Sequence, residues 1–147
     1  MIRPQRIPSP LTRGDRTRFH QLHWAKLAVD WGTAATASAL LWRHHWVAAA
    51  TIGFGPSIVT TAVFLSGRFD AALGKIRNRP SARSIAGGLS PVVNAIRFGG
   101  VTMAWVGSWM HRPWWIPAGV LVVAFGWGLA WRRSTVGESN ALRDWSD

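Results

Sequence analysis

Asp30 is the residue whose type and surroundings most directly suggest chemistry, because it is an acid inside a long apolar stretch. His23, Lys26 and Thr33 lie around Asp30 at spacings of three and four residues, so a helix would place all of them on the same face as Asp30. A carboxylate in a membrane helix costs on the order of 2.5–3.5 kcal/mol, and such acids form ion pairs or mark proton pathways. Asp30 is therefore predicted to be half of a structural pair or a protonatable coupling site.

Arg97 and Asn94 form a matching polar stripe in another apolar stretch. Arg97 and Asp30 lie at similar distances from the starts of their stretches, so they should reach the same depth. A buried ion pair of Asp30 with Arg97, or with Lys26, would offset the cost of burying each charge. At a shallower depth, Lys26 and Arg97 would instead extend their charged ends to the interface.

No other set of side chains predicts catalysis or a cofactor. The chain has no cysteine, which excludes thiol catalysis. Ser57 has no histidine at its depth to activate it, so we predict that it serves in helix packing. His44, His45 and His111 are weak candidates for a metal site, because no acidic or thiol ligand is near them in sequence. We predict no enzyme activity, no metal and no cofactor.

Four apolar stretches carry these residues, and each has about the 20 residues that a helix needs to cross a membrane. The 11 tryptophans gather mostly at the ends of the stretches, as interfacial indoles do. The sequence therefore predicts an all-α fold, a four-transmembrane-helix bundle made of two helical hairpins. The predicted segments are a flexible basic cytoplasmic tail over 1–21, a membrane domain over 22–133 with spans at about 22–42, 45–66, 91–110 and 113–132, a basic cytoplasmic loop over 67–90, and a cytoplasmic tail over 134–147.

The net charge of +11 is unevenly distributed along the chain. Most of the 17 Lys and Arg residues precede the first span, separate the second from the third or follow the fourth, whereas Arg43 and Arg112 lie in the two short turns. By the positive-inside rule, this pattern predicts a multi-pass protein of the cytoplasmic (inner) membrane with both termini cytoplasmic. The same bias explains the basic composition without nucleic acid, and it favours anionic lipid headgroups near the basic loop.

Small residues at four-residue spacing predict where the helices pack. Gly53 and Ser57 lie on such a face in the second span, and Gly100 and Ala104 lie on one in the third. These faces are expected to meet at the bundle centre, within one chain or between copies. Pro56 removes a backbone donor and predicts a kink in the second span.

The remaining patterns concern the loop and the relation of the two hairpins. Apolar residues at helical spacing over 69–76 predict a helical extension or a surface-lying amphipathic turn that ends at Pro80. A shift of 68 residues aligns Trp46 with Trp114, as a parallel repeat or two independent hairpins would give. The functional prediction is a structural or accessory membrane subunit with a buried Asp/Arg pair, in a homo-oligomer or a larger membrane complex. The alternative is a small proton-coupled transporter using Asp30.

Overall fold

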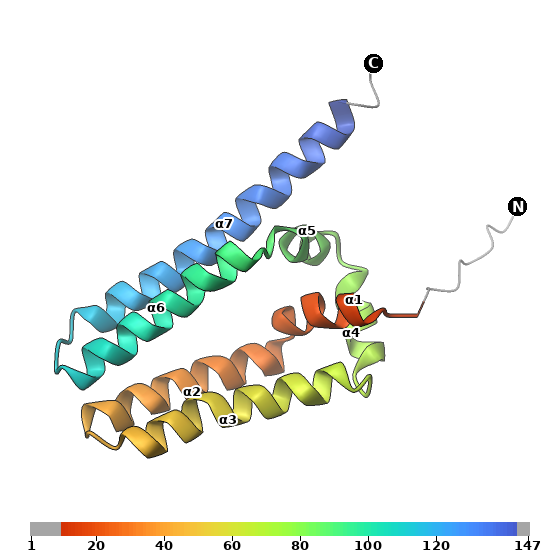
Figure 1. Ribbon diagram of the computed structural model, residues 1–147. Helices are drawn as coiled ribbons and strands as arrows, with labels where there is room; N and C mark the ends of the chain where they lie inside the picture. Colours follow the sequence, from red (N-terminus) through yellow and green to blue (C-terminus); the bar gives the residue numbers. More distant parts are fainter. Residues whose placement is uncertain (1–9, 144–147) are drawn as a thin grey trace, which may run out of the picture.

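The computed structural model describes residues 10–143, with side chains through residue 133, and this part of the chain is helical apart from its turns. Figure 1 shows two long hairpins, α2–α3 and α6–α7, which are joined at one end by the short helices α4 and α5, with α1 lying at the same end. The all-α prediction is confirmed. The elements are α1 (Arg13–Phe19), the 3₁₀ turn η1 (His20–Leu22), α2 (Trp24–Trp42), α3 (Trp46–Leu65), α4 (Asp70–Arg77), α5 (Pro80–Gly88), α6 (Pro91–Trp109) and α7 (Trp115–Arg143).

Three of the four predicted spans match α2, α3 and α6 within two residues at each end. α7 begins at Trp115 rather than Pro113, because the preceding residues form a turn, and it continues to Arg143 beyond the predicted end of the fourth span. Within the described residues, two helical segments are long and apolar enough to cross a membrane, Trp46–Leu65 and Trp115–Arg133. The charged residues of α2 and α6 lower the mean hydropathy of those helices.

α1 is capped at its start and bound to α4 at its middle. Its N-terminus is closed by a capping box, in which Thr12 Oγ1 accepts from the Asp15 amide and the Asp15 carboxylate accepts from the Thr12 amide, each at 3.1 Å. Arg16 then binds Asp70 of α4 with two hydrogen bonds, Nε to Oδ1 at 2.8 Å and Nη2 to Oδ2 at 2.6 Å. Such a bidentate pair orients both side chains.

The predicted flexible tail over 1–21 is therefore corrected for residues 10–21, which form α1 and most of η1 and belong to the fold. The sequence did not predict that α1 belongs to the folded protein, because a short, mostly polar helix carries no apolar period. Residues 1–9 lie outside the described residues.

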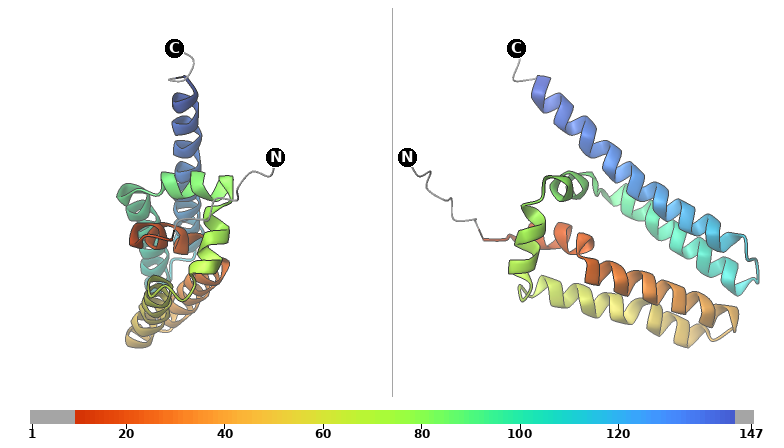
Figure 2. Two further views of the ribbon diagram at one scale, coloured as in Figure 1. Left: turned by 90° about the vertical axis from the view of Figure 1, so that its right-hand side faces the viewer. Right: turned by 180° about the vertical axis from the view of Figure 1, so that it is seen from behind.

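The basic loop 67–90 folds into α4 and α5, which lie with α1 at one end of the hairpins (Figure 2). Leu73 of α4 is fully buried in an apolar cluster with Phe19, Phe64 and Ala86. The apolar face of α4 is thus covered by protein rather than lying on a lipid surface. α5 in turn packs on α7, where Gly88 allows its backbone to approach Ala130.

The two hairpins turn in the same way, through histidines in the left-handed conformation. His44 has a φ of 58° and His111 has a φ of 54°. In each turn the next residue's amide donates to the carbonyl five residues earlier, at 2.9 Å after His44 and 2.8 Å after His111. This is the Schellman pattern, which usually has glycine at the left-handed position.

The aromatic contacts between these turns are reciprocal. Trp42 lies 4.8 Å from His111 and Trp109 lies 4.5 Å from His44, measured between ring centroids. The two histidine rings are themselves 4.9 Å apart. α2 and α6 begin, end and turn at positions 67 residues apart, from 24 to 91, 42 to 109 and 44 to 111. The structural offset of these helices is thus one residue shorter than the sequence alignment suggested.

The small face of α6 packs against α7 within its own hairpin. A Cβ atom built on Gly100 would lie 2.6 Å from the carbonyl oxygen of Gly119, so the two backbones are nearly in contact. Ala104 is 9% exposed and lies against Gly119 as well. Helix α6 therefore uses its small residues to approach α7.

The small face of α3 has different neighbours. Gly53 lies between Ala37 of α2 and the indole of Trp105 from α6, whose ring would be 2.7 Å from a Cβ at that position. Within one chain the small faces of α3 and α6 do not meet each other, because Trp105 lies between Gly53 and the rest of α6. α3 stays helical on both sides of Pro56.

Candidate functional site

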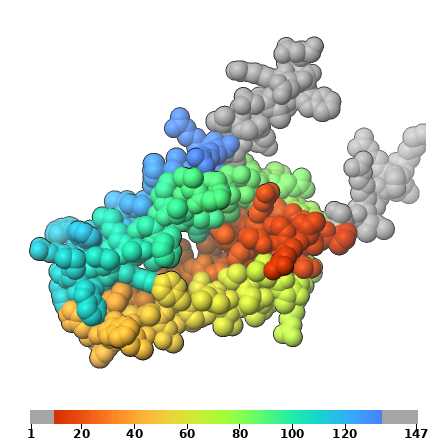
Figure 3. Space-filling model, in the orientation of Figure 1, coloured from red at the N-terminus to blue at the C-terminus, as the bar shows by residue number. Residues whose placement is uncertain are grey.

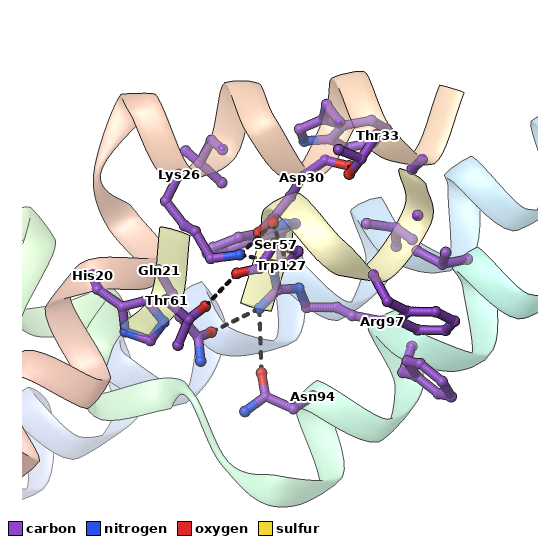
Figure 4. Close-up of a pocket in the computed structure, with 18 of the residues that line it drawn as sticks. His20, Gln21, Lys26, Asp30, Thr33, Ser57, Thr61, Asn94, Arg97 and Trp127 are labelled. Carbon is purple, nitrogen blue, oxygen red and sulfur yellow. Dashed lines mark hydrogen bonds and ion pairs between the residues drawn. The ribbon is translucent and has the colours of Figure 1, made fainter. Parts of the chain in front are cut away.

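A cavity of ≈ 530 Å³ lies between the two hairpins. Figure 3 shows the hollow between α6 and α3, and Figure 4 shows the side chains that line it. The end nearest α1 is polar and the deeper part is apolar. The polar end is lined by His20, Gln21, Lys26, Asp30, Asn94 and Arg97, and the apolar part by Phe54, Val101, Trp105 and Val123.

Asp30 forms a compact cluster with Lys26 and Ser57. Lys26 Nζ donates to Asp30 Oδ1 and, at 2.7 Å, to Ser57 Oγ. Ser57 Oγ donates in turn to Asp30 Oδ1 at 2.7 Å. The Lys26 side chain is only 5% exposed, whereas that of Asp30 is 37% exposed. The cluster neutralises both charges and ties α2 to α3, so Ser57 has a polar role as well as its predicted place in the helix packing.

Arg97 has other partners, and the predicted pair of Asp30 with Arg97 does not form. Arg97 Nη1 donates to Gln21 Oε1 and to Asn94 Oδ1, each at 3.2 Å. The guanidinium carbon lies 4.0 Å from the centroid of the Trp127 ring, a cation–π contact. Asp30 pairs with Lys26 instead because the lysine is one turn away on the same helix. The alternative pair considered from the sequence is the one that the structure contains.

His23 directly precedes α2 and forms no hydrogen bond with Asp30. Its Nδ1 accepts from the Ala25 amide at 3.2 Å, so His23 is the N-cap of α2. Its ring also packs 4.9 Å from the Phe64 ring. Thr33 donates to the Asp30 carbonyl at 3.1 Å rather than to the carboxylate.

The three histidines considered for a metal do not come together as a set. His44 and His111 are adjacent at the turns, and His45 is the first residue before α3. No group of three or more His, Cys, Asp or Glu side chains in the described part of the chain could hold a metal ion.

Several cavity residues were not identified as site residues from the sequence, among them His20, Gln21 and Trp127. His20 and Gln21 lie in the segment predicted to be flexible, and Trp127 was assigned to an interfacial belt. His20 Nδ1 lies 3.1 Å from the Arg16 carbonyl, and burial lowers the pKa of its imidazole, so the neutral ring is favoured. The only sequence signal that could have identified Gln21 was its position directly before the first predicted span.

Comparisons with protein-family models, curated proteins and solved structures gave no match to this chain. Fold and site therefore define the protein only as a class, an all-α chain of two helical hairpins with a charged cavity between them.

Proposed function

We propose that this chain is a four-span membrane protein of the cytoplasmic membrane that acts as a structural or accessory subunit. Its apolar side chains favour a membrane, because many of them face outward. Ile58 is 65% exposed on α3, and Leu121 is 69% and Phe125 61% exposed on α7. Only 11% of the apolar window of Trp46–Leu65 and 22% of that of Trp115–Arg133 are buried, unlike the core helices of a soluble protein.

α2 and α6 fit the same environment despite their charges. Each has 19 residues, which at 1.5 Å per residue is about 28 Å and close to the thickness of the hydrocarbon core. In α2 the acid and the base neutralise each other, and in α6 the guanidinium lies on an indole ring. Membrane helices carry charges at low cost when the charges face the interior of the bundle and find partners.

The observation that carries the structural role is the closed cluster of Lys26, Asp30 and Ser57. All three polar groups have partners within it, and it joins two helices that pack as one hairpin. Interhelical polar contacts of this kind hold membrane helices in register. The proposal does not require a substrate.

A double-mutant cycle in detergent tests this role. Asp30→Asn leaves a buried lysine without a counter-ion, so the stability should fall, by less than the about 3–5 kcal/mol of a fully buried pair because the Asp30 side chain is 37% exposed. Adding Lys26→Met should recover much of that loss, because it removes the unpaired charge. Arg112→Gln, at the exposed outer turn, is the control and should be neutral. If Asp30→Asn leaves the stability unchanged, the cluster is not structural.

A small proton-coupled transporter is the second candidate, and the exposure of Asp30 favours it. The carboxylate lines the cavity, and its Oδ2 accepts no hydrogen bond from the described residues. In that role Asp30→Asn would fold normally but abolish pH-driven flux in proteoliposomes, and Lys26→Met would not restore it. Flux through wild-type protein that Asp30→Asn leaves unchanged would contradict this candidate.

A further inference from the structure

Arg97 gives the cavity an unbalanced positive charge. Lys26 and Asp30 form one neutral pair, and no other carboxylate lines the cavity within the described residues. The hydrogen-bond acceptors that Arg97 does have, Gln21 and Asn94, are neutral amides at the long distance of 3.2 Å. A guanidinium in an apolar setting normally binds an anion, so its charge is available for one.

The hydrogen bonds of the guanidinium show which of its edges lacks a partner. One edge, at Nη1, is used by the two amides, and one face lies on Trp127. Nε is buried with no hydrogen-bond partner among the described residues, and Nη2 forms no hydrogen bond there either. Nε–H and Nη2–H point in nearly parallel directions and match the two oxygens of a carboxylate or phosphate.

Arg16 shows what this edge does when an anion is present. Its Nε and Nη2 bind the two oxygens of Asp70 at 2.8 and 2.6 Å. Arg97 has the same edge without an oxyanion. Its side chain is also held in place, because its Cγ packs against Gly126 of α7, where a Cβ would be only 2.6 Å away.

The rest of the cavity indicates what the anion is attached to. From the polar end the lining becomes apolar and aromatic, with Phe54, Val101 and Trp105 at the deeper level. The volume of ≈ 530 Å³ is in the usual range for a small-molecule site. The cavity is of a size to hold one hydrocarbon chain with a small head.

We propose that the cavity binds a single-chain anionic amphiphile, with the oxyanion of its head on the Nε–Nη2 edge of Arg97 and its hydrocarbon chain among the apolar residues. The head would complete the hydrogen bonding of Arg97 and balance its charge. The chain would lie along the cavity away from Gln21 and Asn94. This inference does not depend on the role of the Lys26–Asp30 pair or on the number of membrane spans.

Calorimetric titration of the full chain in a nonionic maltoside detergent at pH 8.5 tests the proposal. Laurate and dodecyl phosphate should each bind saturably, and dodecanol, which has the chain without the charge, should only partition into micelles. Inorganic phosphate, which has the charge without the chain, should bind at least ten-fold more weakly than dodecyl phosphate. Equal binding of dodecanol and laurate, or of inorganic and dodecyl phosphate, would overturn the assignment.

Variants locate the site. Arg97→Gln should weaken laurate binding about ten- to hundred-fold, as expected for losing hydrogen bonds to a charged group. Arg97→Lys should fall between, because it keeps the charge but not the two-pronged edge. Arg112→Gln removes one arginine from the opposite end of the molecule and should leave binding unchanged. Laurate binding that survives Arg97→Gln would place the ligand elsewhere.

Asn94→Asp keeps the proposal testable if Arg97→Gln does not fold. The new carboxylate would lie where Asn94 Oδ1 now accepts from Arg97, so it would supply the missing counter-ion within the protein. Folding should be unimpaired, as circular dichroism would verify, while laurate binding should fall at least ten-fold. Unchanged binding in folded Asn94→Asp protein would refute the role of Arg97.

Discussion

The contact between Gly100 and α7 allows a sharp test of how the second hairpin is held together. Gly99 and Gly100 are neighbours on α6, but they face different surroundings. A Cβ at position 100 would be 2.6 Å from Gly119 O and 2.9 Å from the Val123 amide nitrogen. A Cβ at position 99 would have no neighbour within 4 Å. The same Gly→Ala change can thus be made with and without a steric conflict.

The expected magnitudes follow from these distances. Relief of the contact to the 3.4 Å of ordinary packing requires a shift of 0.8 Å from 2.6 Å, and backbone atoms cannot rotate away as a side chain would. Overpacking of this kind costs about 1–3 kcal/mol. Alanine also improves helix propensity by about 1 kcal/mol, equally at both positions. Gly99→Ala should therefore be neutral or stabilising, and Gly100→Ala should be less stable than Gly99→Ala by about 1–3 kcal/mol.

Thermal unfolding in a nonionic detergent, followed by circular dichroism, measures the difference. For a chain of this size, about 2–4 °C per kcal/mol places the midpoint of Gly100→Ala roughly 2–12 °C below that of Gly99→Ala. Comparing the two variants with each other removes the propensity term. Equal midpoints would mean that α6 and α7 are not in backbone contact at Gly100, and the packing described for this hairpin would be incorrect.

Three further predictions concern the pH dependence of stability, the ion pair that joins α1 to α4, and the membrane topology. Burial lowers the pKa of His20 in the folded protein. The neutral ring therefore contributes to stability above the pKa of the unfolded state, near 6.5, and this contribution is lost as the pH falls through the lower pKa of the folded state. His20→Gln should accordingly lose less stability between about pH 7.5 and 5.5 than the wild type. The hydrogen bonds from Arg16 lower the pKa of Asp70, so their contribution should persist above about pH 4 and disappear below it. Asp70→Asn should therefore speed hydrogen exchange in α1 at pH 7, and the protection of α1 in this variant should no longer change as the pH falls through about 4. Unchanged exchange at pH 7 would show that the Arg16–Asp70 pair does not anchor α1. Reporters fused after Asp147 or inserted at Asn78 should lie in the cytoplasm and one inserted at residues 43–45 on the other side, whereas a C-terminus outside would exclude an even number of spans.

The long helices could be predicted from the sequence because their signals are local. Tryptophans and capping residues such as Ser90, whose Oγ accepts from the Val93 amide at 3.3 Å, define helix ends within two residues. α1 could not be predicted in this way. It is stabilised by a side chain 54 residues away, Asp70, and such a contact has no signature in either segment alone.

The site was predictable in its members but not in its pairing. Asp30, Lys26 and Arg97 were all identified, because charges in apolar stretches are conspicuous. Which cation pairs with Asp30 depends on how the side chains extend into the space between the hairpins. Lys26, one turn away on the same helix, is nearer to Asp30 than Arg97 on the other hairpin. Trp105 decided the packing for the same reason, since its indole Nε1 donates to the Ala34 carbonyl at 3.3 Å and separates two faces that sequence periodicity would have joined.

The reciprocal contacts at the turns show that α2 and α6 hold equivalent places in two similar hairpins. With the offset of 67 residues, Asp30 in α2 corresponds to Arg97 in α6, so equivalent positions of the two halves carry opposite charges. A symmetric pair of identical first halves would face acid with acid, and a pair of second halves would face base with base. Joining two unlike halves breaks this symmetry in the middle of the molecule while keeping it at the turns. The two hairpins consequently bring different charges to the cavity, which two identical hairpins could not do.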